Sequence, residues 1–144
     1  MMRLPGDSAQ PGRGYPVPMF EWPDTFENLA DAIDSGCFSS SDLPDPDRFG
    51  EFATARLTAS SRGAYHTPSV VARWMVERLQ PTGGRILDPA CGTGQLLAAV
   101  AHCASRDPED FYGWDIDPQS VAAARIMVWL ANDKRGQVAD YVNI

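Results

Sequence analysis

Residues 86–97 read ILDPACGTGQLL, in which an apolar run, a pair of glycines and a second apolar run follow one another. Two apolar residues at its start predict a short buried strand, and the apolar run after Gly94 predicts a helix. Between them, Gly92 and Gly94 permit a tight turn and let the backbone approach a ligand closely. The following helix would aim its free backbone N–H groups at that ligand. The stretch therefore predicts a small-molecule site at the carboxyl end of a strand.

The residues after this stretch repeat the pattern. FYGWDID predicts a second strand, and PQSVAAARIMVWLAND predicts a helix that opens with a proline. Strands and helices that alternate at this spacing indicate an α/β fold with a parallel sheet. We expect parallel strands near residues 85–88 and 111–115, with a helix from about Gln95 crossing between them. KRGQVADYVNI, residues 134–144, predicts the start of a next strand.

An acid follows the second predicted strand. Asp115 lies 21 residues after Gly94, and an acid about 20 residues after such a turn is placed to accept the ribose hydroxyls of a nucleoside. A tight structural turn and a nicotinamide cofactor site are alternatives. The nicotinamide fingerprint has glycine where this chain has Leu97. That mismatch and the DPAC entry to the turn both disfavour the nicotinamide site.

Three sections divide the chain. Residues 1–19 are rich in proline and glycine and predict a disordered lead. Residues 20–60 predict a helical N-terminal segment and a linker. Residues 61–144 contain the α/β unit.

Local signals predict further helices upstream of the glycine turn. Asp24 is expected to cap a helix that Gly36 ends. RFGEFATARL, residues 48–57, predicts a short helix. Thr67 is expected to cap another helix, with Pro68 in its first position. The predicted apolar stripe of that last helix comprises Val70, Val71, Trp74, Met75 and Leu79.

Cysteines and tryptophans carry no predicted chemistry. Cys37, Cys91 and Cys103 lack metal-ligand spacing and are expected to be reduced, mostly buried thiols, so no metal site is predicted. Three aromatic side chains are expected in the core or at its edge, namely Trp74, Trp114 and Trp129.

The charge and the apolar content of the chain argue against some classes of protein. The formal net charge of −7 argues against a whole-chain electrostatic grip on nucleic acid. The acidic excess lies mostly in residues 1–60, with ten acids and four arginines, against nine acids and eight bases in residues 61–144. No run approaches the ~20 apolar residues of a membrane helix, and the N-terminus lacks a secretory signal. A cytoplasmic protein without a membrane partner is expected.

Three motifs resemble one family. DPACGTGQLL resembles motif I, the S-adenosylmethionine-binding motif of adenine-N6 DNA methyltransferases of the restriction–modification type. GAYHTP resembles motif X of that family, and GWDIDP resembles motif II. The motifs occur in the family order X, I, II within residues 62–144. The resemblance implies a partial Rossmann-like S-adenosylmethionine methyltransferase fold, with the first two βα units of a parallel sheet, preceded by a helical or irregular N-terminal segment.

The resemblance also implies roles for single residues. Motif X would line the methionine end of S-adenosyl-L-methionine, and Asp88 would face its ammonium group. Asp115 would bind the ribose hydroxyls, and Ile116 would pack on the adenine ring. His66 replaces the usual tyrosine, and Asp115 replaces the usual glutamate. The implied cofactor-binding residues are Tyr65, Thr67, Pro68, Asp88, Ala90, Gly92, Gly94, Asp115 and Ile116.

The family's methyl-transfer segment has no counterpart here. Family members carry Asn/Asp-Pro-Pro-Tyr/Phe, whose polar groups accept hydrogens of the target amine and whose ring stacks on a flipped base. No such tetrapeptide occurs in the 144 residues, so no catalytic residue is assigned. The chain alone is expected to be inactive, as a truncated product, a fragment or half of a split enzyme. Its expected partners are double-stranded DNA and a second polypeptide, or a missing C-terminal portion, with the catalytic and target-recognition parts.

Two other interpretations stay open. One is a non-catalytic module, which docks on a partner or is a methyltransferase remnant. The other is an RNA or protein N-methyltransferase, which shares motifs I and II. GAYHTP upstream of motif I favours the DNA adenine group.

Overall fold

A computed structural model describes residues 22–38, 41–58 and 66–144. The predicted disordered lead, residues 1–19, and Tyr65 of motif X lie outside the described residues. No helix in these three ranges is both long and apolar enough to cross a membrane.

The two predicted strands form a small parallel sheet. β1 (Ile86–Asp88) pairs with β2 (Phe111–Gly113) in parallel. The connection consists of α4 (Gln95–Cys103) and the short 3₁₀ helix η1 (Pro108–Asp110). The expected parallel strands and crossing helix are therefore confirmed.

The second strand leads into the longest helix of the described chain. α5 (Pro118–Ala131) has its proline in the first turn, where no backbone N–H is needed. The Asp117 carboxylate caps this helix by accepting the backbone N–H groups of Gln119 at 3.2 Å and Ser120 at 3.1 Å. Nearly every residue from Ala122 to Ala131 is buried, because α5 lies at the centre of the helical layer.

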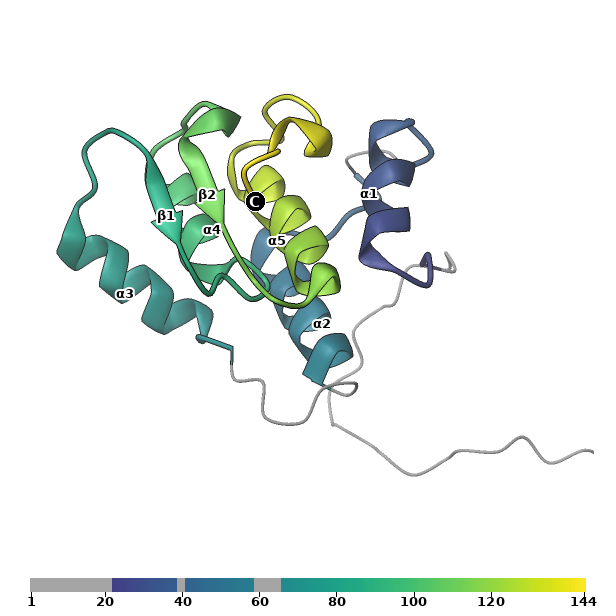
Figure 1. Ribbon diagram of the computed structural model, residues 1–144, viewed down its shortest axis with the longest axis horizontal. Coiled ribbons are helices and arrows are strands. Elements are labelled where there is room, and N and C mark those ends of the chain that lie inside the picture. The colour runs from purple at the N-terminus through teal and green to yellow at the C-terminus, as the bar shows by residue number, and fades with distance from the viewer. Residues whose placement is uncertain (1–21, 39–40, 59–65) are drawn as a thin grey trace, which may run out of the picture.

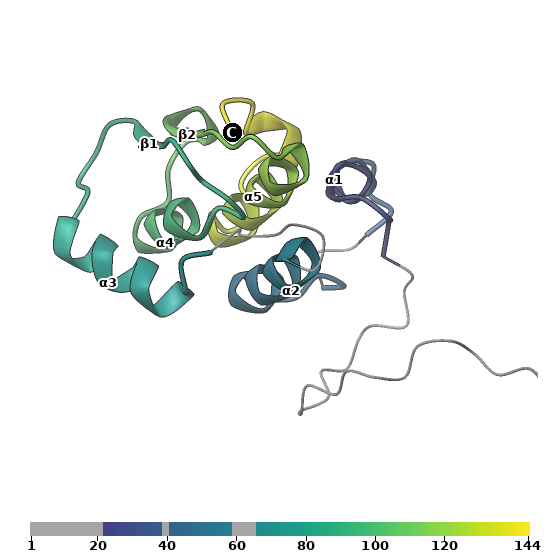
Figure 2. The same cartoon turned by 60° about the horizontal axis from the view of Figure 1, so that its bottom comes forward.

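The helices lie on one side of the sheet (Figures 1 and 2). α4 and α5 pack against each other beneath the two strands, with α3 beside α4, α1 beside α5, and α2 beyond α5. In both views, the other face of the sheet carries no helix from the described residues. The fold is thus a mixed helical structure with a two-stranded parallel sheet at its surface.

The first helix begins one residue later than predicted. α1 (Phe26–Asp34) is capped by Thr25, whose hydroxyl accepts the Asn28 backbone N–H at 3.1 Å. The prediction of Asp24 as the cap was therefore wrong. Thr25 rather than Asp24 has the extended backbone next to the first helical turn. Gly36 follows the helix with φ +78°, the left-handed conformation expected at a helix end.

The second helix is longer than the predicted residues 48–57. α2 (Pro46–Thr58) starts in the proline-rich loop, and the Asp45 carboxylate accepts the Arg48 backbone N–H at 3.1 Å. Proline suits the first helical turn, which explains the earlier start. Its buried residues are Phe49, Gly50, Ala53 and Leu57.

The third helix starts one residue later than predicted, and its predicted apolar stripe does not face the core. α3 (Ser69–Leu79) has Pro68 rather than Thr67 at its N-cap, because the Pro68 carbonyl accepts the first helical bond from Ala72. Its buried residues are Ala72 and Val76. The predicted apolar stripe was wrong as a core-facing stripe. Its exposed members are Val70, Val71, Trp74 and Leu79.

The packing partner of α3 explains this orientation. α3 contacts α4, a helix rich in alanine, so the two backbones approach closely and a narrow contact buries small side chains. The prediction that the tryptophans lie in the core or at its edge was wrong for Trp74 and Trp114, which are 57% and 58% exposed. It is confirmed for Trp129, which is buried.

The predicted strand in residues 134–144 does not form. The segment makes a second 3₁₀ helix, η2 (Val138–Asp140). The Asp34 carboxylate of α1 accepts two backbone N–H groups of this segment at 2.8 Å, which holds it against the helices. A single sheet-like bond remains, from the Gly113 N–H to the Asn143 carbonyl at 3.1 Å.

Candidate functional site

The glycine turn between β1 and α4 is held by backbone geometry. Gly92 has φ +52° and Gly94 has φ +85°, both in the left-handed region that favours glycine. The Gly94 N–H donates to the Cys91 carbonyl at 2.8 Å and closes the turn. A Cβ atom on Gly94 would lie 2.9 Å from the Ala124 Cα of α5, so this glycine also permits close helix packing.

Two carboxylates lie on either side of this turn. Asp115, just past β2, accepts the Gly92 N–H at 3.0 Å and the Asp117 N–H at 2.9 Å. Asp88, the last residue of β1, accepts the Ala90 N–H at 3.1 Å. Asp115 therefore fastens the glycine turn to the end of the neighbouring strand. Each carboxylate oxygen has further acceptor capacity for a ligand hydroxyl.

The Cys91 thiol lies inside this carboxylate-lined turn. Burial, together with the negative charges of Asp88 and Asp115, raises the pKa of Cys91 to about 12. The thiol is therefore neutral and unsuited to act as a nucleophile. Cys37 and Cys103 are exposed, so the prediction of mostly buried thiols holds for Cys91 alone. None of the three cysteines forms a disulfide.

Alkylation of Cys91 is expected to be roughly a thousandfold slower at pH 8 than that of an unperturbed thiol, because the thiolate fraction falls tenfold for each unit of pKa. The folded pKa exceeds the unfolded value of 9.0. The thiol's contribution to stability is therefore complete below pH 9 and is lost as the pH rises toward 12. Mass spectrometry after iodoacetamide treatment of a Cys37→Ser/Cys103→Ser variant measures the rate. Equal rates for folded and urea-unfolded chain would contradict the expectation.

His66 brings the segment before α3 to the glycine turn. A Cβ atom on Gly92 would lie 3.2 Å from His66 Nδ1, so the imidazole lies against the bare backbone of the turn. Its Nε2 atom is buried and has no hydrogen-bond partner among the described residues. An unpaired buried nitrogen costs about 1–3 kcal/mol, so this atom has unused hydrogen-bonding capacity next to the turn.

The other residues predicted from the sequence differ in exposure. Thr67 is half-buried, whereas Pro68 and Ala90 are exposed beside the same segments. Ile116 is 100% exposed. These side chains leave surface available next to the turn.

Sequence reasoning missed two residues that support the turn. Thr93 is buried, and its hydroxyl lies 3.4 Å from the hydroxyl of Thr54 on α2, which links the N-terminal helices to the turn. A Cβ atom on Gly113 would lie 2.9 Å from Leu97 Cδ1, so β2 needs glycine where α4 crosses it. Only tertiary contacts reveal either role.

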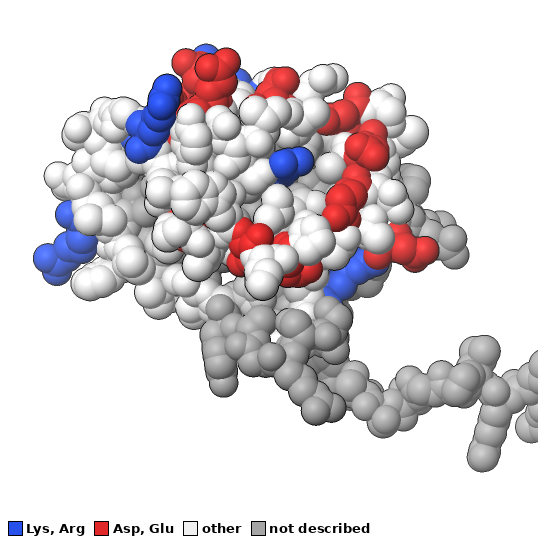
Figure 3. Space-filling model, in the orientation of Figure 1, with Lys and Arg blue, Asp and Glu red and all other residues white. Residues whose placement is uncertain are grey.

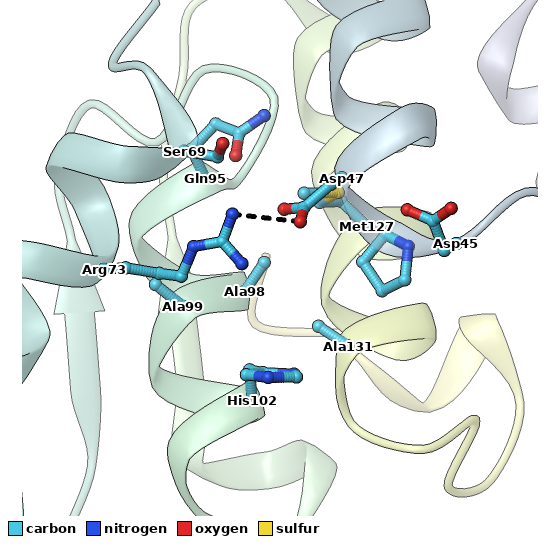
Figure 4. A pocket seen from close by; sticks show the side chains of 11 residues that line it. Asp45, Asp47, Ser69, Arg73, Gln95, Ala98, Ala99, His102, Met127 and Ala131 are labelled. Carbon is cyan, nitrogen blue, oxygen red and sulfur yellow. Dashed lines mark hydrogen bonds and ion pairs between the residues drawn. The ribbon is translucent and has the colours of Figure 1, made fainter.

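A separate cavity of about 300 Å³ lies between α2 and the α3–α4 pair (Figure 4). An ion pair between Arg73 and Asp47 spans it at 3.0 Å. None of the described residues predicted for the cofactor lines this cavity. His102 lines it and is exposed. The described residues contain no group of three side chains suited to hold a metal ion.

Comparisons with known proteins point to methyltransferases. The family described as N-6 DNA Methylase matches residues 49–141. A ribosomal protein L11 methyltransferase of Paraburkholderia xenovorans is 38% identical over 84 residues, which is 58% of this chain and 26% of the relative. The Type I restriction enzyme EcoEI methylase subunit of Escherichia coli is 45% identical over 56 residues, 38% of this chain and 11% of that subunit.

A third relative covers more of the chain. The ribosomal protein L11 methyltransferase of Vibrio vulnificus is 31% identical over 108 residues, 75% of this chain and 33% of the relative. The chain thus spans a third or less of the length of these three curated relatives. No solved structure matches it.

Proposed function

The chain belongs to the N-6 DNA methylase family, and from that premise we propose that it is the S-adenosyl-L-methionine-binding part of a DNA adenine-N6 methyltransferase with a Rossmann-like fold. One observation carries the proposal: the Asp115 carboxylate fastens the glycine turn of β1–α4 at the end of β2. A nucleoside cofactor needs these elements together, namely bare backbone, a helix start and an acid on the adjoining strand.

The residues around the turn fit such a cofactor. The unpaired Nε2 of His66 offers a buried polar contact, and fully exposed Ile116 offers an apolar surface for a flat ring. Asp115 keeps acceptor capacity for ribose hydroxyls beside its two backbone bonds. When bound, S-adenosyl-L-methionine supplies a methyl group on a positively charged sulfur.

Within this proposal, each part of S-adenosyl-L-methionine has its own contact residues. Asp115 binds the ribose hydroxyls, Ile116 packs on the adenine ring, and Asp88 faces the ammonium group. Gly92 and Gly94 form the floor of the pocket. The remaining binding residues are Tyr65, Thr67, Pro68 and Ala90.

Asp115→Ala is expected to weaken S-adenosyl-L-methionine binding by about 1–3 kcal/mol, because hydrogen bonds to a charged acceptor are lost. Calorimetry on the full chain measures the affinity. Asp31→Ala, at an exposed acid on α1, is the control and should bind like the native chain. Asp115→Glu, with the family's usual residue, should bind more tightly than Asp115→Ala. Unchanged affinity in a folded Asp115→Ala variant would remove this acid from the site.

A protein N-methyltransferase is the second candidate. Two of the relatives described above are named ribosomal protein L11 methyltransferases, and one of them aligns with 75% of this chain. The family of the chain favours DNA as the methyl acceptor, and the cofactor site would be the same for either substrate. Acceptor assays therefore decide between the two, whereas cofactor binding does not.

A further inference from the structure

The side chain of Gln119 joins the starts of α1 and α5. Its Oε1 atom accepts the Phe26 backbone N–H at 2.8 Å, and its Nε2 atom donates to the Glu27 carboxylate. Gln119 lies in the first turn of α5, and its two partners lie in the first turn of α1. A carboxamide suits both partners because it offers an acceptor and a donor, and the Phe26 N–H has no partner within its own helix. Gln119 therefore holds the amino ends of the two helices together.

A continuous series of hydrogen bonds connects Gln119 with the glycine turn. The Gln119 N–H donates to Asp117 Oδ1 at 3.2 Å, and the Asp117 N–H donates to Asp115 Oδ1 at 2.9 Å. The second oxygen of Asp115, Oδ2, accepts the Gly92 N–H at 3.0 Å. The orientation of the Asp115 carboxylate thus depends on where the first turn of α5 lies, and Gln119 ties that turn to α1.

α2 makes a corresponding contact with the start of α4. Gln95 is the first residue of α4 and directly follows Gly94. A Cβ atom on Gly50 of α2 would overlap with Gln95 Nε2, so the Gln95 side chain rests on bare helix backbone. One helical turn further along α2, the Thr54 hydroxyl lies 3.4 Å from the Thr93 hydroxyl. Each N-terminal helix therefore contacts the start of one helix that begins at the candidate site.

Arg56 of α2 joins the two N-terminal helices to each other. Its Nη2 atom donates to the carbonyls of Pro23 and Asp24, just before α1, at 3.2 Å and 2.6 Å. Its guanidinium also lies 5.6 Å from the centre of the Phe26 ring. These contacts close a ring that runs from the glycine turn through α5, α1 and α2 and back to the turn. Side chains of a binding site keep their orientation when surrounding hydrogen bonds hold them, and Asp115 is one member of this ring.

We propose that Gln119 is a positioning residue for the cofactor. By bonding α1 at two points, it fixes the first turn of α5 and so directs the remaining acceptor capacity of Asp115 toward the ribose hydroxyls. This inference rests on the proposed function, because the ribose belongs to the proposed cofactor. Gln119 acts through Asp117 and Asp115. α1 lies outside residues 49–141, which the family matches, so the proposal assigns a role to a helix that this match does not include.

The charges around Glu27 make this contact sensitive to one substitution. α1 carries three acids and no basic residue, and Figure 3 shows acidic side chains along the side of the molecule that α1 occupies in Figure 1. Gln119→Glu keeps the size of the side chain and an acceptor for the Phe26 N–H. It replaces the donor to Glu27 by a second carboxylate, and two like charges in contact repel each other.

Calorimetry with S-adenosyl-L-methionine on the full chain measures the consequence for binding. Gln119→Glu should weaken binding about five- to tenfold, because the bond to Glu27 is lost and α5 moves away from α1. Glu27→Gln should change the affinity little, since a carboxamide can also accept from Gln119. Combining Glu27→Gln with Gln119→Glu exchanges donor and acceptor and should restore most of the native affinity. Gln80→Glu, at an exposed position after α3, is the matched control and should bind like the native chain.

Two further measurements distinguish positioning from a contact that only stabilises the fold. In the free chain, Gln119→Glu should speed hydrogen exchange at the Gly92 and Asp117 N–H groups, while the buried residues Ile126–Val128 of α5 keep their protection. The second measurement uses S-adenosylhomocysteine and an analogue of it that lacks both ribose hydroxyls. Gln119→Glu should weaken the first ligand, whereas the analogue should bind the native and variant chains within about twofold.

Four results would overturn the proposal. They are unchanged exchange at Gly92 and Asp117, equal acceleration of exchange throughout α5, an equal loss of affinity for both homocysteine ligands, and no recovery in the double variant. A native chain that binds no S-adenosyl-L-methionine would instead refute the proposed function. The exchange rates at Gly92 and Asp117 would then still show whether Gln119 holds Asp115 in place.

Discussion

Gly94→Ala is expected to lower the free energy of unfolding by about 2–4 kcal/mol. The left-handed φ of +85° accounts for about 1 kcal/mol. The remainder comes from overpacking, since the new Cβ would lie 2.9 Å from the Ala124 Cα and 3.0 Å from its Cβ. Backbone on a buried helix has little room to move. Urea denaturation measures the loss, and the melting temperature should fall by roughly 5–15 °C.

Gly36→Ala is the matched control for this prediction. Gly36 has φ +78°, but nothing lies within 4 Å of a Cβ placed on it. It therefore tests the backbone conformation without the packing, and about 1 kcal/mol is expected. If both substitutions have the same effect on stability, α4 and α5 are not tightly packed at Gly94.

The glycine turn and its flanking elements were predictable because their signals are local. Positive φ at Gly92 and Gly94, the proline at the start of α5 and the apolar run of β1 follow from residue chemistry and short-range spacing. The parallel pairing followed from the strand–helix–strand order. The position of Asp115 beside the turn followed from the same order.

Features set by tertiary contacts were not predictable. The spacing of Val70 and Trp74 indicates an apolar stripe, yet it gives no information on which side of α3 meets α4. The last segment is apolar enough for a strand, but Asp34, more than 100 residues away, binds the backbone N–H groups of η2. The bond from the Gly92 N–H to Asp115 was likewise invisible in the sequence, which suggested only a ribose ligand.

Methyl transfer to adenine by this chain alone is expected to be absent. Cofactor binding and methyl transfer need different residues, and the residues proposed above serve cofactor binding. Transfer to an aromatic amine requires acceptors for its hydrogens and an aromatic face for the flipped base, and no Asn/Asp-Pro-Pro-aromatic tetrapeptide occurs in the sequence. Residues 61–144 carry nine acids and eight bases, so this part of the chain has no net positive charge to attract phosphates. Transfer of radiolabel from S-adenosyl-L-methionine to an adenine-containing duplex measures the activity.

When a second polypeptide that carries an Asn/Asp-Pro-Pro-aromatic tetrapeptide is added, we expect the duplex to become labelled. In that mixture, Asp115→Ala should reduce labelling about tenfold or more at limiting cofactor, in line with the weaker binding, while Asp31→Ala should leave it unchanged. A parallel reaction with ribosomal protein as acceptor tests the second candidate function, since label in protein rather than DNA would reverse the assignment of substrate. Label in DNA from the purified chain without any partner would refute the expectation that methyl transfer needs a second polypeptide. The methyl-transfer residues would then have to lie within these 144 residues.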